Sequence, residues 1–298
     1  MRMATYTAAR REAKQGYVMI APTLIYALVL LAAPLLTILA FSFFKDGYLT
    51  VIREVTLANY IAVWTDPIFR AILLRSLCVA VMVTALTVGT AYPIAYFLSF
   101  GVSPGKKSFW LFLITIPFWT SYLVRVFLWK VIMGYNGVIN SGFEMLGLMG
   151  DGRLFEDPFR MLSTMPAIAV TLAHCYAPFA ILPIFVALEK IDRSLHEAGR
   201  DLGESRWTTF LRVTLPLSMP GVVAAVLVVF IPVIGDYVTP ELIGGGKLPM
   251  VANMIQAQML PLDNKPMGSA IAVSAMVTVT VIALIFVGLV RIFVKGAK

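Results

Sequence analysis

The chain has 298 residues, of which 59% are hydrophobic and only 13% charged, and its formal net charge is +8. Soluble domains contain about 25% charged residues, so a soluble protein of this length could not bury so much apolar surface. The solvent around most of the chain must therefore be lipid. Its two cysteines and two histidines have neither metal-ligand nor disulfide spacing, so we predict no metal site.

The first apolar run, residues 17–44, follows a basic N-terminal segment. A signal sequence also begins with basic residues, but its apolar region has about 7–15 residues and ends at a small-residue cleavage site. This run is far longer and ends in Phe-Ser-Phe-Phe-Lys. We therefore expect a retained membrane helix.

Five more apolar runs follow, and each could cross a bilayer, because about 20 helical residues span its hydrocarbon core. The sequence predicts an all-α membrane protein, with six transmembrane helices in a single domain over residues 1–298. Proline interrupts several runs, which membrane helices tolerate where neighbours satisfy the freed carbonyls. The expected spans are residues 17–44, 75–100, 108–133, 161–189, 218–236 and 267–294.

The basic residues are distributed unevenly between the two sides of the membrane. If the N-terminus lies inside, fourteen of the 24 Lys and Arg residues fall in cytoplasmic segments and eight in outer segments. The positive-inside rule then predicts that both termini are cytoplasmic. Membrane topology explains the excess of basic over acidic residues, so we expect no nucleic-acid partner.

A polar stretch at residues 190–216 separates the fourth and fifth spans. Ser194 and Glu197 form a Ser-x-x-Glu capping pattern, and Gly203 stands where a helix end often needs a positive φ. Ser205 can cap a second helix. The pattern predicts a helix–turn–helix on the cytoplasmic side.

Small residues leave the first of these helices almost bare, at Ala198, Gly199 and Gly203. We expect this to let another protein approach closely. In the alternative interpretation, Glu197 only caps its helix and Gly203 only turns the chain. Pro216 is expected to end the second helix.

Nothing in the sequence indicates catalysis. Gly244-Gly245-Gly246-Lys247-Leu248 lacks the first Gly and the Ser/Thr of a nucleotide-binding loop. We predict no enzymatic activity, no catalytic residue and no cofactor site in this chain. A stand-alone secondary transporter remains an alternative, although we see none of the inverted repeats typical of that class.

One motif resembles a known family. Residues 197–203, Glu-Ala-Gly-Arg-Asp-Leu-Gly, precede Val213-Thr214-Leu215-Pro216 by nine residues. The pattern is similar to the Glu-Ala-Ala-x3-Gly-x9-Ile-x-Leu-Pro loop of ATP-binding-cassette importer permeases, with Gly199 for the second Ala and Val213 for Ile. Further stretches, Ala91–Tyr96, Ile116–Arg125 and Gly235–Leu242, resemble the spermidine/putrescine branch.

This resemblance implies a type I importer fold and a set of partners. These are a cytoplasmic ATPase dimer that binds ATP and Mg, a second permease subunit in a heterodimer, and a periplasmic binding protein. It also implies a multi-pass protein of the bacterial inner membrane. In the family the loop docks onto the ATPase, which here implicates Glu197, Ala198, Gly199, Asp201, Gly203, Leu215 and Pro216.

A polyamine path needs carboxylates and aromatic faces, for ion pairing and cation–π contact. Asp236 is the main candidate, since an ionisable group at membrane depth indicates function; it either contacts the solute or pairs with Arg125. A deep Arg125 would repel a polycation and suit a carboxylate, so an opine or amino-acid derivative is the alternative solute. The candidate path residues are Trp119, Tyr122, Arg125, Asp236, Tyr237 and Glu241.

Overall fold

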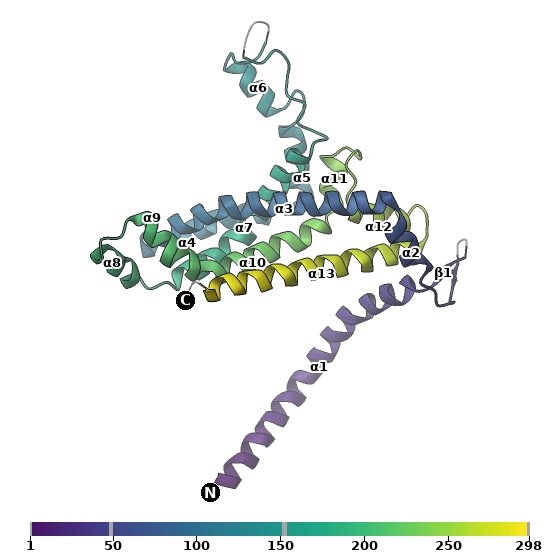
Figure 1. Ribbon diagram of the computed structural model, residues 1–298, viewed down its shortest axis with the longest axis horizontal. Coiled ribbons are helices and arrows are strands. Elements are labelled where there is room, and N and C mark those ends of the chain that lie inside the picture. Colours follow the sequence, from purple (N-terminus) through teal and green to yellow (C-terminus); the bar gives the residue numbers. More distant parts are fainter. Residues whose placement is uncertain (1, 48–49, 151–153, 297–298) are drawn as a thin grey trace. The chain divides into compact units, whose positions relative to one another are not determined.

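The computed structural model describes residues 2–47, 50–150 and 154–296, and it is built almost entirely of helices (Figure 1). Within the described residues, five helices are long and apolar enough to span a membrane, or six if one sharply bent pair counts as a single span. The prediction of an all-α membrane protein is therefore confirmed. The chain forms two compact units, residues 1–65 with 258–274, and residues 66–257 with 275–298.

The first unit begins with a long helix, α1 (Arg2–Ser42), whose most apolar part buries none of its residues. A two-stranded antiparallel hairpin, β1 (Lys45–Asp46) and β2 (Val51–Ile52), and helix α2 (Ala58–Thr65) follow. The amide of Asn59 fixes α2 to the end of α1, because its nitrogen donates to the carbonyl oxygens of Ser42 and Phe44 at 3.0 and 2.7 Å.

The core of the second unit is made by three helices that run side by side in Figure 1: α3 (Pro67–Tyr96), α7 (Met165–Glu189) and α10 (Leu215–Ile234). Gly221 shows how closely α10 approaches α7. A Cβ added there would lie 2.5 Å from the Cβ of Ala187 and 2.6 Å from the carbonyl oxygen of Pro183. Small residues allow such close packing of membrane helices. Fully buried core residues include Val83, Leu172, Ile184, Leu188, Ala225 and Val229.

Helix α3 begins eight residues before the expected span at residue 75. The reason is local: the carboxylate of Asp66 accepts a hydrogen bond from the backbone N–H of Ile68, and Pro67 occupies the first turn, where it needs no donor. At its other end α3 continues into a π-helical turn, η1 (Phe97–Gly101), just beyond Pro93.

The third expected span, residues 108–133, is broken. Helix α4 (Pro104–Thr115) and a 3-10 turn, η2 (Ile116–Trp119), meet α5 (Tyr122–Ile132) at an angle of 86°. The chain is extended at Thr120 and Ser121, which interrupts the helical hydrogen bonds. Sequence hydropathy follows apolar content alone, so it does not detect this break.

Short helices occupy the segments expected outside the membrane: α6 (Val138–Met145), α11 (Val238–Leu242) and α12 (Val251–Met259). The buried side chain of Asn140 organises the first of these segments. Its nitrogen donates to the carbonyl oxygens of Tyr135 and Phe159 at 2.9 and 3.0 Å, and its oxygen accepts from the N–H of Phe159 at 3.0 Å. The last long helix is α13 (Lys265–Gly296).

Candidate functional site

Residues 190–216, called the hairpin below, form the predicted helix–turn–helix, but its start differs from the prediction. Helix α8 (Ser194–Asp201) is capped by Asp192, whose Oδ1 accepts a hydrogen bond from the N–H of Ser194 at 2.9 Å. This bond lowers the pKa of the Asp192 carboxyl group. Ser194 is thus inside the helix, so the predicted Ser194–Glu197 capping pair is wrong, and Glu197 is exposed in the first turn.

Gly203 ends the first helix as expected, with a φ of +77° that side chains rarely adopt. Gly199 has a different role from the one the sequence indicated. It is buried, and a Cβ there would lie 3.0 Å from Oγ1 of Thr209 in α9 (Arg206–Thr209). The small residue therefore lets α8 cross α9, whereas Ala198 on the same helix is exposed.

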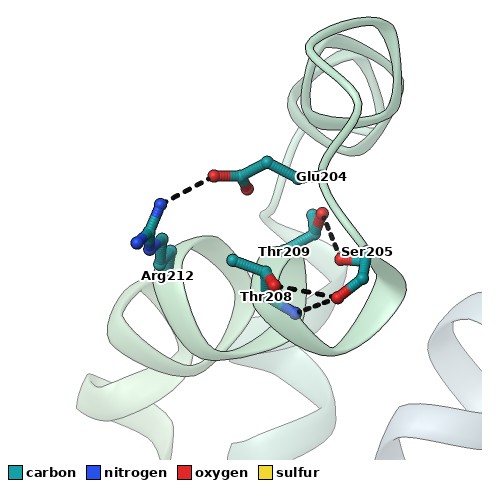
Figure 2. A network of polar contacts seen from close by, with 5 residues as sticks. All are labelled: Glu204, Ser205, Thr208, Thr209 and Arg212. Atoms are coloured by element: carbon teal, nitrogen blue, oxygen red, sulfur yellow. Dashed lines mark hydrogen bonds and ion pairs between the residues drawn. The ribbon is translucent and has the colours of Figure 1, made fainter.

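The turn between the two helices is fixed by the polar network in Figure 2. Ser205 caps α9 as predicted, since its Oγ accepts from the N–H of Thr208 at 3.1 Å. The Oγ1 of Thr209 donates to the carbonyl oxygen of Ser205 at 3.1 Å. Glu204 and Arg212 form an ion pair at 2.9 Å that bridges the turn and the following helix. The turn is therefore held in one shape.

Pro216 does not end the second helix, contrary to expectation. One continuous helix runs from Arg206 to Ile234, through a π-helical turn, η3 (Phe210–Thr214), into α10. In this turn the N–H of Leu215 bonds to the carbonyl oxygen of Phe210, five residues back. The wider turn accommodates Pro216, which lacks an N–H and would clash in a regular helix. Leu215 and Pro216 are half-buried at the start of α10.

The hairpin exposes large apolar side chains, which is unusual for a segment whose ends are well packed. Leu202 at the turn is 83% exposed and Trp207 is 68% exposed, and Leu195 and Leu211 are exposed as well. The acidic side chains of Glu197 and Asp201 are also exposed. Such apolar surface with a polar rim is typical of a protein contact.

A partly buried ion pair ties the start of the hairpin to the rest of its unit. The Nζ of Lys107 in α4 lies 2.5 Å from Oε1 of Glu189 at the end of α7, and it donates to the carbonyl oxygen of Ser99 in η1 at 2.8 Å. Arg193, one residue before α8, donates to the same carbonyl at 3.4 Å. Four segments thus meet at one polar cluster.

Aromatic contacts make a second attachment. Phe210 lies edge-on to both Tyr92 and Tyr96 of α3, with ring centroids 5.8 Å apart in each pair. His196 of α8 contacts Phe100 with centroids 4.9 Å apart. The hairpin is therefore packed against the end of α3. Sequence patterns do not indicate these pairs, because their members are far apart along the chain.

Some of the predicted path residues are buried and hydrogen-bonded within the protein, and the others are exposed. Asp236 is buried, and its carboxylate accepts hydrogen bonds from the hydroxyl of Tyr122 at 2.9 Å and from the N–H groups of Val238 and Thr239. The Tyr122 hydroxyl also lies 2.7 Å from Oγ1 of Thr239. Asp236 therefore caps α11 and joins it to the start of α5.

Arg125 is not the partner of Asp236. In the part of the chain that the structure describes, the ion pairs are Lys107–Glu189, Arg212–Glu204 and Lys265–Asp263. Arg125 is buried, its guanidinium lies 4.7 Å from the ring centre of Phe118, and it donates to the carbonyl oxygen of Cys175 at 3.3 Å. The guanidinium thus uses an aromatic face and a carbonyl in place of a carboxylate.

The side chains of the remaining predicted path residues are exposed. Trp119 is 76% exposed beside the break between η2 and α5, Tyr237 is 47% exposed, and Glu241 is exposed on α11. Sequence reasoning missed Thr239, and it missed the contact between the indole N–H of Trp129 and Nδ1 of His174 at 3.1 Å. These polar groups gather because α5 and α11 pack on each other and on α7.

Comparison with known proteins agrees with this architecture. Residues 18–298 match the family described as "Binding-protein-dependent transport system inner membrane component". The chain is 35% identical to the "Spermidine/putrescine transport system permease protein PotB" of Haemophilus influenzae, covering 85% of this chain and 86% of the relative. It is 31% identical to the "Inner membrane ABC transporter permease protein YdcU" of Escherichia coli, covering 88% and 82%.

A solved structure has the same fold. The "bacterial alginate ABC transporter in complex with alginate pentasaccharide-bound periplasmic protein" superposes with a TM-score of 0.73 at 18% identity, covering 96% of both chains. The family match extends over nearly the whole chain, and the membrane helices and the hairpin lie within it. The chain therefore belongs to the family of binding-protein-dependent transport system inner membrane components, as a multi-pass permease of the inner membrane.

Proposed function

We propose that this permease forms the path through which an ATP-binding-cassette importer takes up a polyamine such as putrescine or spermidine. The observation that carries the proposal is the 35% identity to a spermidine/putrescine permease over 85% of the chain. The exposed Trp119, Tyr237 and Glu241 supply the aromatic faces and the carboxylate that a polycation needs.

The partners follow from the same proposal. A periplasmic binding protein delivers the solute, a second permease subunit completes the path, and a separate ATPase dimer binds ATP and Mg and hydrolyses the nucleotide. Both termini lie in the cytoplasm, as the distribution of Lys and Arg supports. The hairpin is then cytoplasmic and docks on the ATPase through Leu202, Trp207 and the neighbouring Glu197, all of which are exposed.

The alternative solute is an opine or an amino-acid derivative. Arg125 supports it, because a buried cation with no carboxylate partner in the described residues suits an anionic ligand. Against it, Arg125 already has an aromatic face and a carbonyl oxygen as partners. Family membership argues against the stand-alone secondary transporter that the sequence left open.

The test is uptake of labelled spermidine or putrescine into proteoliposomes that contain the permease, its sister subunit and the ATPase, with the binding protein outside. ATP-dependent uptake is expected, and Glu197→Arg is expected to reduce both uptake and co-purification of the ATPase. Glu54→Arg, an equal charge change at an exposed residue far from the hairpin in sequence, serves as the control.

Two outcomes would refute parts of this proposal. Uptake that follows an ion gradient in the absence of ATP would overturn the importer assignment. Uptake of an opine or amino-acid derivative with no competition by polyamines would overturn the solute assignment, while leaving the docking role of the hairpin in place.

A further inference from the structure

A pocket lies where the hairpin meets the end of α3. It is lined by Tyr96 of α3, by His196 and Arg200 of α8, and by Arg206, Thr209 and Phe210 at the start of the next helix. The crossing of α8 over α9 at Gly199 brings two arginines that are six residues apart to the wall of one cavity. The sequence motif alone would not indicate that they share it.

The pocket is cationic, and no ion pair among the described residues balances its charge. Neither the Arg200 nor the Arg206 side chain has a hydrogen bond or an ion pair with another residue in the ranges that the structure describes. No carboxylate lines the cavity, and Glu204, the acidic residue of the turn, is already bound to Arg212. Two like charges facing one cavity repel each other, and an anion between them would be attracted to both.

His196, which lines the pocket, has one ring nitrogen without a hydrogen-bond partner among the described residues. His196 bonds through Nε2 to Oγ1 of Thr214 at 2.9 Å, while its Nδ1 is buried without a hydrogen-bond partner among the described residues. Buried polar atoms in native proteins are usually satisfied. The positive charge of the two arginines at the pocket wall is what fits a small anion.

Resting on the function proposed above, we propose that this pocket receives a carboxylate side chain of the partner ATPase. The apolar side chains of Leu202 and Trp207 are exposed on the same hairpin, and Trp207 stacks on Phe210 of the pocket wall with centroids 5.4 Å apart. A protein surface covers such side chains and supplies a carboxylate at the same time. Planar guanidinium groups bind carboxylates through two parallel hydrogen bonds.

A lipid phosphate is the competing anion, and helix length argues against it. The helix from Arg206 to Ile234 has 29 residues, which corresponds to about 43 Å at about 1.5 Å per residue. The hydrocarbon core of a bilayer is about 30 Å thick. If Ile234 lies at the outer boundary of that core, the pocket lies about 13 Å beyond its inner boundary, where water and a soluble partner have access.

The experiment measures the affinity of purified ATPase for the permease complex in nanodiscs, at low and at high salt. Arg200→Gln and Arg206→Gln are compared with Lys190→Gln, which removes one charge from an exposed residue of the same hairpin outside the pocket. Each pocket variant is expected to weaken binding about tenfold at low salt, and the double variant to lose most of the salt dependence. Lys190→Gln is expected to stay within about threefold of wild type. Gel filtration of each complex confirms assembly.

The carboxylate is then identified by rescue. In an Arg206→Glu background, surface Asp and Glu residues of the ATPase are changed to Arg one at a time, and the proposal expects that one of them restores affinity. Pocket variants that bind like Lys190→Gln would overturn the proposal and leave the proposed function intact. Wild type that fails to bind any ATPase would overturn both. If the pocket variants lose phosphatidylglycerol binding but keep the wild-type affinity for the ATPase, the pocket is assigned to a lipid headgroup and the proposal is overturned.

Discussion

The close crossing of α7 and α10 makes Gly221 a position at which one added methyl group should be destabilising. In a Gly221→Ala variant the new Cβ would lie 2.5 Å from the Cβ of Ala187 and 2.6 Å from the carbonyl oxygen of Pro183. Carbon atoms in contact are ordinarily about 3.5–4.0 Å apart, so the two helices must separate by about 1 Å. The carbonyl belongs to the backbone and cannot rotate away as a side chain would.

The size of the effect follows by comparison with Gly89→Ala. Gly89 is exposed in α3, and a Cβ there meets nothing within 4 Å. Both changes gain about 0.5–1 kcal/mol of helix propensity, so that contribution cancels between them. The difference that remains is the cost of overpacking, about 1–3 kcal/mol. Gly221→Ala should be the less stable variant by that amount.

The assay is reversible unfolding of the purified chain in mixed micelles, with increasing SDS and with helical circular dichroism as the signal. Both variants are measured beside wild type in the same detergent. Equal unfolding free energies for the two variants, to within about 0.5 kcal/mol, would show that α7 and α10 do not pack at this distance. A Gly221→Ala variant more stable than wild type would refute the overpacking argument entirely.

Three further predictions concern polar contacts. Glu189→Ala should lower the thermal unfolding temperature more than Lys107→Met. It leaves the Lys107 charge, on a side chain only 11% exposed, without its partner, whereas Lys107→Met leaves the Glu189 charge, on a side chain 36% exposed, and an unpaired charge costs more when it is more buried. Equal shifts of the unfolding temperature would contradict this. Tyr122→Phe removes the hydroxyl that donates a hydrogen bond to Asp236, a contact worth about 0.5–1.5 kcal/mol. The initial uptake rate should therefore fall severalfold at unchanged expression. Normal uptake would exclude a role for this contact in transport. Asn140→Ala loses the hydrogen bonds that hold the segment after α5, so limited proteolysis should cut that segment faster than in wild type; an unchanged cleavage pattern would contradict this.

The hydrogen-bond partners of Asp236 could not be predicted from the sequence. Counting residues along the fifth and the third spans places Asp236 and Arg125 at similar depth in the membrane. An ion pair between them was therefore one of the two alternatives. The structure instead bonds Asp236 to Tyr122 and to the N–H groups that begin α11. The short helix α11 gives no periodic signal in the sequence, so the capping role could not be foreseen.

The amino-acid sequence by itself determined the class of the protein and the position of the hairpin. Lipid as solvent follows from the small share of charged residues, because no soluble fold of this size could bury the remainder. The turn at Gly203 and the cap at Ser205 were likewise predictable, since both depend on contacts within a few residues.

Only the tertiary structure decided which residues of the hairpin face inward. Gly199 packs on Thr209, Lys107 finds Glu189 across 82 residues of chain, and Arg200 and Arg206 share a pocket with Tyr96. Each of these contacts joins segments whose approach is set by how the helices cross. Periodicity and motif spacing describe one segment at a time, so they carry no information about those crossings.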